Sequence, residues 1–256
     1  MNSKPVVCWN NCLARPDVTL SHTESADGHP FQNLFDWRDY TLWKTSGTGE
    51  VFVKLDAGSG NSVSADTWAM AGHDLCSAGV TGMGLYYSDD DVTYTCCAGP
   101  CSPEADGVFF RKFESVTARY FKMVLPAGYS KSPAIGVLYM GTCLGFPACP
   151  EAGFDPDSFE VEEAVQYSRT GNLLGVAQKY RKWSIPLDFS RLPASFIENE
   201  WTPFRKDHGS RPFFFAWDPA GRPEEARFVR LAASGVEAPY EGPWRSLSLR
   251  LSGRAD

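Results

Sequence analysis

Residues 33–58 read NLFDWRDYTLWKTSGTGEVFVKLDAG, and the end of this stretch shows which secondary structure the chain favours. The residues that alternate there are Val51, Val53 and Leu55 on one side and Phe52 and Lys54 on the other. A period of two places successive side chains on opposite faces of an extended chain. The run stops at Gly58, so we predict a half-buried β-strand over residues 50–58.

The segments that follow continue the same pattern. We predict a strand over 67–73, and residues 81–97 hold two short apolar runs around the acidic turn Asp89–Asp91, which is typical of a hairpin. Residues 108–125 and 134–144 place β-branched and aromatic residues between turns of Gly, Pro and Ser. Strands at such intervals without helical periods between them favour a β-sandwich or jelly roll.

Length and charge exclude several classes of function. The 256 residues suit one large domain or two modest ones. A net charge of -7 without a basic run argues against a nucleic-acid partner. Residues 1–20 lack the apolar segment of a signal peptide, and no stretch reaches membrane-spanning length. We therefore expect no membrane insertion and folding in a cytosol.

Cysteine usage divides the chain. All eight cysteines, which are Cys8, Cys12, Cys76, Cys96, Cys97, Cys101, Cys143 and Cys149, precede residue 150. Residues 143–158 are rich in Pro and Gly, as a linker would be. We predict a β-sandwich over residues 1–148 and a smaller β-domain with one helix over residues 149–256, so that the whole chain is mainly β.

The second part combines strands with one helix. Two strands are expected around a turn at residues 170–172. Residues 196–204 then place apolar side chains on one helical face, with Gly209 as the stop, and Pro203 favours a kink or an early break. The side chains on that face are Phe196, Ile197, Trp201 and Phe204. Residues 212–218 and 226–233 are typical of a hairpin, and residues 244–253 of a closing strand.

The segment RPFFFAWDPAGRP, residues 211–223, concentrates aromatic side chains before a turn. Its large apolar residues are Phe213, Phe214, Phe215 and Trp217. A strand with apolar groups on both faces must be covered twice. Two interpretations follow: a central strand of the core, or a strand that meets a neighbouring subunit, where aromatic residues are enriched.

The first part resembles the discoidin, or coagulation-factor C-type, sandwich with a galactose-binding-like fold. The resemblance lies in residues 33–58, in WAMAGHDLCSAGVTGMGLYYSDDDVTY at 68–94 and in FESVTARYFKMVL at 113–125. It covers about residues 30–142. It implies the sandwich fold, and it implies loops at one end of the sandwich that often bind ligands.

The second part is similar to the small β-domain of minor tail proteins of tailed bacteriophages, of the distal-tail and tail-tip type. The motifs are TGNLLG at 170–175, a helix that ends in His208–Gly209, and RPFFFAWDP at 211–219. Together the two resemblances imply a structural protein of a siphophage virion, assembled in the host cytoplasm. It would form a three- or six-fold ring with itself and link the tail tube to tip or receptor-binding proteins.

The sequence gives little support for catalysis. The four histidines, at positions 22, 29, 73 and 208, form neither a nucleophile elbow nor an HExxH pair. We expect structural hydrogen-bonding roles for them. Asp89, Asp90 and Asp91 would suit calcium, but aspartates at a hairpin tip are usually solvated. We predict no enzyme, and zinc or an iron–sulfur cluster on the cysteines is the one cofactor alternative left open.

Carbohydrate binding is the alternative function, which would make the protein a lectin-like module for glycans on a host surface. Aromatic side chains stack on sugar rings, and the candidates here are Trp9, Trp37, Tyr40 and Trp43. The same positions are often core residues in this fold, so a core role is the competing interpretation.

The cysteines leave three alternatives open. If the strands at 67–73, 81–87 and 92–97 alternate in direction, Cys76, Cys96, Cys97 and Cys101 lie at one end, and Cys8 and Cys12 join them if the first strand runs the same way. Up to six thiols would then form disulfides, bind zinc or an iron–sulfur cluster, or stay free. Cys143 and Cys149 are further candidates for the same chemistry.

Overall fold

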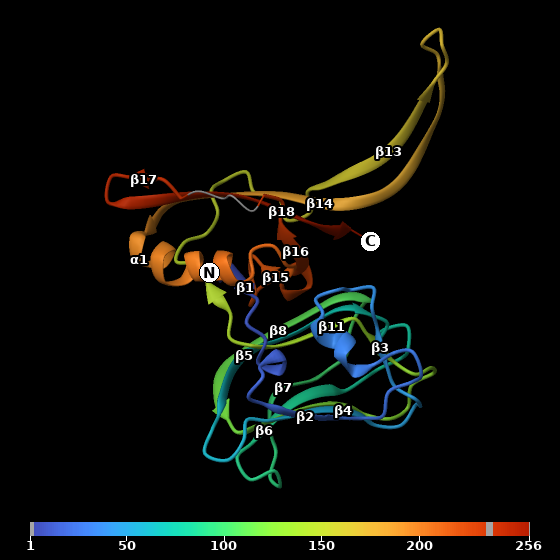
Figure 1. The fold of residues 1–256 in the computed structure, drawn as a ribbon, viewed down its shortest axis with the longest axis vertical. Helices are drawn as coiled ribbons and strands as arrows, with labels where there is room; N and C mark the ends of the chain where they lie inside the picture. Colours follow the sequence, from blue (N-terminus) through green and yellow to red (C-terminus); the bar gives the residue numbers. More distant parts are fainter. Residues whose placement is uncertain (1–2, 234–237, 256) are drawn as a thin grey trace. The chain divides into compact units, whose positions relative to one another are not determined.

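The structure is a computed structural model, and it describes residues 3–233 and 238–255. Strands dominate these residues, which confirms the prediction of a mainly β chain (Figure 1). Contacts between Cα atoms group the chain into two compact units. Unit 1 comprises Met1–Gly145 and Phe214–Ala226, and unit 2 comprises Phe146–Phe213 and Arg227–Asp256.

Unit 1 is a sandwich of two antiparallel sheets. One sheet has the order β2 (Thr19–His22), β4 (Val51–Asp56), β9 (Tyr120–Leu125), β6 (Met83–Ser88) and β7 (Thr95–Cys101). The other has the order β11 (Val137–Gly141), β5 (Val63–His73) and β8 (Gly107–Ala118). In β4 every second residue from Val51 is buried, and β6 and β7 form the predicted hairpin. The β-sandwich predicted for the first part of the chain is therefore present.

One continuous hydrophobic core fills the space between these sheets. Trp68 of β5 and Phe121 of β9 are almost completely buried in it, so both sheets contribute. Trp43, in the short strand β3 (Trp43–Lys44), is also fully buried, and its indole N–H donates to Ser25 Oγ at 3.0 Å. β3 pairs with β10 (Ala134–Ile135). Two 3₁₀ helices, η1 (Cys12–Ala14) and η2 (Phe31–Phe35), pack on this core.

The loop before β3 lies directly on the backbone of two glycines. A Cβ atom on Gly72 would be 2.0 Å from the carbonyl oxygen of Asp39, and a Cβ atom on Gly136 would be 2.8 Å from the same oxygen. Gly72 also has φ +62°, which favours glycine on its own account. These close contacts fix the position of the loop. Within it, Trp37 has φ 60°, and the centroid of its ring lies 6.4 Å from that of the Tyr139 ring.

Three short strands complete unit 1, and one of them comes from far along the chain. β1 (Val6–Cys8) pairs with β12 (Leu144–Gly145) and with β15 (Phe213–Ala216). A disulfide joins Cys8 to Cys143. Because β1 takes its second partner from β15, residues 214–226 belong to unit 1. The predicted division into 1–148 and 149–256 places this segment in the second domain.

Unit 2 is built on a long antiparallel pairing. β14 (Leu173–Pro193) pairs with β13 (Phe159–Tyr167) on one side and with β18 (Trp244–Ala255) on the other. β16 (Arg227–Leu231) and the short β17 (Tyr240–Glu241) also pair with β18. The predicted turn at residues 170–172 joins β13 to β14. The predicted closing strand is β18, which buries every second residue from Leu247 to Leu251.

The helical segment of unit 2 runs through Pro203 instead of breaking there. It consists of α1 (Ala194–Phe196), a π-helical turn η3 (Ile197–Trp201) and α2 (Thr202–Asp207). The π turn bonds Thr202 N–H to the carbonyl of Ile197, so the wider turn accommodates a proline that an uninterrupted α-helix would not. Trp201 and Phe204 are buried against Phe146 and Phe213, respectively. No helix in the described ranges is long and apolar enough to span a membrane.

We expect Gly72→Ala to destabilise unit 1 by more than about 3 kcal/mol, because the new methyl group would overlap the Asp39 carbonyl in addition to straining the backbone. Gly60→Ala is the matched control, since Gly60 has φ +77° and open space around it. Its cost should be about 1–2 kcal/mol. Urea unfolding measures both values. Equal losses would show that the contact with Asp39 carries no energy.

Candidate functional site

A surface hollow of about 290 Å³ lies on unit 1. It is formed where the loop after β7, the first half of β8 and the 3₁₀ helix η4 (Pro223–Glu225) meet. Ligand pockets are concave and begin at about 300 Å³ for drug-sized molecules. The hollow is therefore of a size for a ligand with one or two small rings.

The walls of the hollow are largely apolar. Pro103 is buried, Phe109 is half-buried, and Pro223 lines another side. The Phe109 ring meets the buried Trp68 ring edge to face, with centroids 4.9 Å apart. Because Trp68 fixes it from the core side, Phe109 offers a rigid aromatic surface to the hollow.

Polar groups stand beside these walls. Arg111 is exposed, and in the described part of the chain its guanidinium has no hydrogen bond or ion pair. Glu104 and Glu224 add carboxylates at the rim. Burial raises the pKa of the Cys101 thiol, and the nearby Arg111 lowers it less. The thiol is therefore protonated at neutral pH, and the hollow presents donors and acceptors instead of a reactive thiolate.

The loop that carries this site is tied to its neighbours. Ser77 N–H donates to Asp106 Oδ1 at 3.1 Å, and Gly82 N–H donates to Ser102 Oγ at 3.3 Å. The Cys76 thiol donates to the Glu104 carbonyl at 3.4 Å. These contacts fix the loop before any ligand binds, which lowers the entropy cost of binding.

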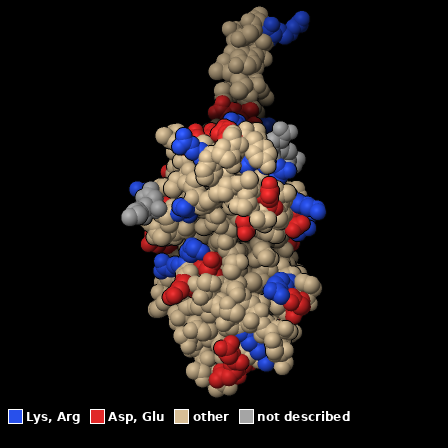
Figure 2. Space-filling view, turned by 90° about the vertical axis from the view of Figure 1, so that its left-hand side faces the viewer, with Lys and Arg blue, Asp and Glu red and all other residues tan. Residues whose placement is uncertain are grey.

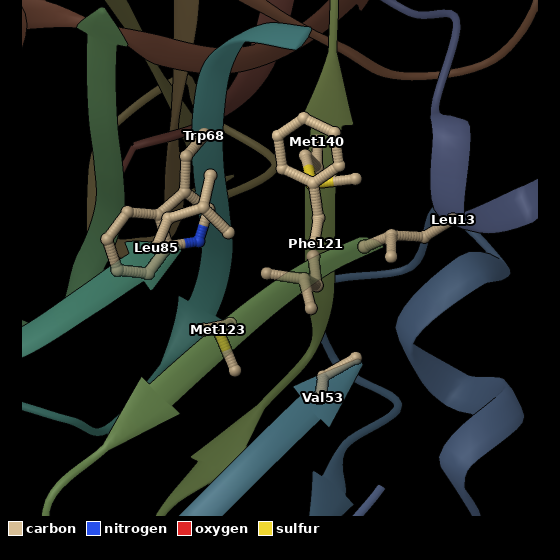
Figure 3. Close-up of a pocket in the computed structure, with 8 residues that line it drawn as sticks. Leu13, Val53, Trp68, Leu85, Phe121, Met123 and Met140 are labelled. Carbon is tan, nitrogen blue, oxygen red and sulfur yellow. The ribbon is translucent and has the colours of Figure 1, made fainter. Parts of the chain in front are cut away.

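A second cavity lies inside the sandwich core and measures only about 10 Å³. Figure 3 shows the apolar side chains of Leu13, Trp68, Leu85 and Phe121 around it. The Trp68 indole N–H has no partner among the described residues. One donor cannot hold a water molecule, which needs two or more polar partners, so this cavity is a packing defect and no ligand site.

The predicted sugar-stacking residues differ in their exposure to solvent. Trp43 is fully buried and Trp37 is 7% exposed, so neither has a free ring face for a sugar. Trp9 is half-buried. Tyr40 is 69% exposed, on a turn held by Thr41 Oγ1, which donates to Asp36 Oδ2 at 2.6 Å. Sequence reasoning missed Phe109 and Arg111, because the hollow also needs residues 223 and 224, which lie more than a hundred positions away.

Two of the eight cysteines, Cys8 and Cys143, form a disulfide. The other six are free thiols, and within residues 3–233 and 238–255 no group of three His, Cys, Asp or Glu side chains is placed to hold a metal. The expected gathering of Cys8 and Cys12 with the other thiols fails because Cys8 pairs with Cys143 and Cys12 is buried in the core. Burial raises the pKa of Cys12 to about 11 and that of Cys97 to about 12.

The other candidate residues serve structure. Phe213, Phe214 and Phe215 are buried, and Trp217 donates from Nε1 to Glu225 Oε2 at 2.6 Å. The three phenylalanines therefore agree with the first interpretation of this segment, a central strand of the core. His22 stacks on Phe31 with centroids 3.8 Å apart, and Asp90 caps its turn by accepting from Val92 N–H and Thr93 N–H. These backbone bonds lower the pKa of Asp90 to about 2.

No protein-family model matches this sequence, and no curated protein matches it. Solved structures similar to it include CpGH89CBM32-6 produced by Clostridium perfringens, at 16% identity over 51% of this chain and 98% of that one, with a TM-score of 0.42. CpGH89CBM32-5 from Clostridium perfringens, in complex with GalNAc-β-1,3-galactose, has 15% identity over 49% and 96%, with a TM-score of 0.40. The CBM32 of AlyQ, in complex with 4,5-unsaturated mannuronic acid, has 19% identity over 48% and 92%, with a TM-score of 0.37. The likeness covers about half of this chain.

We expect the protein to lose stability as the pH falls from 6.5 towards 4, in part because of His73. Burial lowers the pKa of His73 to about 4, and its Nε2 has no partner among the described residues. The folded state holds the ring neutral, whereas the unfolded state protonates it below pH 6.5. The contribution of His73 is complete above pH 6.5 and decreases by about 3 kcal/mol down to pH 4.

The difference between the wild type and His73→Asn isolates this effect, because His208, whose pKa burial also lowers, titrates in both proteins. Urea unfolding at a series of pH values should give a steeper pH dependence for the wild type. Parallel curves for the two proteins would contradict the assignment.

Proposed function

We propose that unit 1 is a non-catalytic carbohydrate-binding module and that the hollow beside β8 takes a neutral saccharide of one or two rings. The observation that carries this proposal is the combination of a rigid aromatic wall with polar groups around it. Phe109 and the prolines suit the apolar face of a sugar ring. Arg111 can donate to hydroxyl oxygens, and Glu104 can accept from hydroxyl groups.

The charged side chains around the hollow limit the class of saccharide that it can bind. Two carboxylates and one guanidinium line the hollow, and Arg222 interacts electrostatically with one of the carboxylates, that of Glu224. An acidic sugar would be repelled by the Glu104 carboxylate, whereas a neutral sugar offers hydroxyl groups to Glu104 and Arg111 alike. We therefore favour neutral hexoses and their N-acetylated forms over uronic acids.

A structural place in the tail of a long-tailed phage is the second candidate function. What favours it is the β-ribbon of unit 2, which exposes apolar side chains that an isolated lectin would not need. In this proposal the chain resides in the virion tail after assembly in the host cytoplasm. Its sandwich would then contact glycans on the host surface, so the two candidates are compatible. Immunolabelled micrographs of virions test the tail location.

We expect the full-length protein to bind neutral glycans on an array, and Arg111→Ala to weaken that binding at least ten-fold. Loss of a charge-assisted hydrogen bond costs about 1.5–3 kcal/mol, which corresponds to such a factor. The array should include galactosides, fucosides and uronic acids, and calorimetry should follow any signal.

Tyr40→Ala is the matched control, because Tyr40 is exposed on a loop that does not line the hollow. Its affinity should equal that of the wild type. If Tyr40→Ala abolishes binding and Arg111→Ala does not, the site lies on the loop at residues 36–41. If no glycan binds at all, the carbohydrate proposal is wrong.

A further inference from the structure

Unit 2 carries a two-stranded ribbon, formed by β13 and the first part of β14, that has no neighbouring strand. The pairing of β14 with β18 begins only at Arg181, so residues 173–180 have β13 as their sole strand partner in the described chain. In Figure 1 the ribbon extends well beyond the other strands of unit 2. A lone two-stranded ribbon is marginally stable in water, and three or more strands or a packing partner are needed for independent stability.

The two faces of this ribbon differ in chemistry. Residues that pair across the two strands have their side chains on the same face of the ribbon, and successive pairs alternate between the faces. Lys179 and Leu174 are extra residues of β14 at two bulges, so the alternation of the pairs continues past them. One face, here termed the apolar face, carries Phe159, Val161, Val165, Tyr167, Leu173 and Val176, which are 38% to 64% exposed. The other face carries Glu160, Glu162 and Lys182 together with the 54% exposed Tyr180, which pairs with Glu162. Lys182 Nζ lies 2.5 Å from Glu162 Oε1 and 3.4 Å from Glu160 Oε2.

The charged groups of this second face are thus paired with each other, whereas six large apolar side chains of the apolar face stay exposed in the described chain. Between residues 164 and 180 the ribbon has two charged residues, Arg169 and Lys179. Figure 2 shows this outer part as an almost uncharged column, with basic side chains at its tip and acidic ones at its base. Such a surface favours an apolar protein partner over a polyanion or a strongly charged surface.

Two charged residues on the apolar face, Glu163 and Arg181, indicate that the partner is another copy of this chain. Glu163 and Arg181 belong to successive residue pairs on this face, since Val161 pairs with Arg181 and Glu163 pairs with Gln178. Neither side chain has an ion pair in the described residues, although the Arg181 guanidinium lies 5.4 Å from the centre of the Phe159 ring. A two-fold axis between these steps would bring each Glu163 to the Arg181 of another copy.

We propose that a second copy of this chain covers the apolar face, with the two ribbons packed face to face and antiparallel. The contact is isologous, so every residue on one side meets the same set on the other. It buries both apolar faces and forms two ion pairs that cross the axis. The assembly surface of the protein is therefore the ribbon and not the aromatic segment at 213–217, whose three phenylalanines are buried.

Analytical ultracentrifugation of the full-length protein at micromolar concentrations tests this proposal. The wild type should contain an even number of copies. Val165→Arg places a charge on the apolar face and should raise the dissociation constant at least ten-fold. Gln166→Arg, which adds the same charge to the opposite face one residue away, should leave the dissociation constant within about two-fold. Far-UV circular dichroism checks that both variants keep their strands.

A charge exchange tests the two-fold geometry. Glu163→Arg and Arg181→Glu should each weaken association, because each places like charges together across the axis. The double variant should regain most of the wild-type affinity. A monomeric wild type, an odd number of copies, or a double variant no better than either single one would overturn the proposal. Glycan binding is measured separately in unit 1, so failure of one proposal leaves the other unaffected.

Discussion

The carbonyl oxygen of Asp39 lies where a side chain on Gly72 or Gly136 would otherwise lie, and unit 1 depends on this close approach. It seats the loop between η2 and β3 against the backbone of β5 and the residue before β11. Trp37 can then turn inward and meet Tyr139, whose ring lies 6.0 Å from that of Phe214. The backbone contact of this loop is thereby continuous with a series of packed aromatic rings that extends to β11 and β15.

The parts of the fold that the sequence predicts are those determined by neighbouring residues. The alternation from Val51 to Leu55 identified β4, and the acidic turn after Ser88 identified the β6–β7 hairpin. The apolar face at residues 196–204 identified the helical segment, but Pro203 suggested a break that the π turn avoids. Each of these patterns depends on interactions within a few residues, which is why they can be recognised without the structure.

What sequence reasoning missed depends on distant partners. Nothing near Cys8 indicates that Cys143 is its partner, because the two are 135 positions apart. The buried phenylalanines at 213–215 were recognised as a strand with two covered faces, but not as the strand that pairs with β1. The hollow was missed for the same reason, since η4 reaches β8 only when the chain returns to unit 1. Alternation does indicate the amphipathic ribbon, but not that the ribbon lacks a third strand.

The return of residues 214–226 to unit 1 has a consequence for how the protein is made. During synthesis on the ribosome, the sandwich strands emerge first. β1, however, cannot pair with β15 until most of unit 2 has been translated. Unit 1 can therefore reach its final form only after the chain has passed through residues 146–213. The order of translation thus couples the maturation of the two units, although each has its own core.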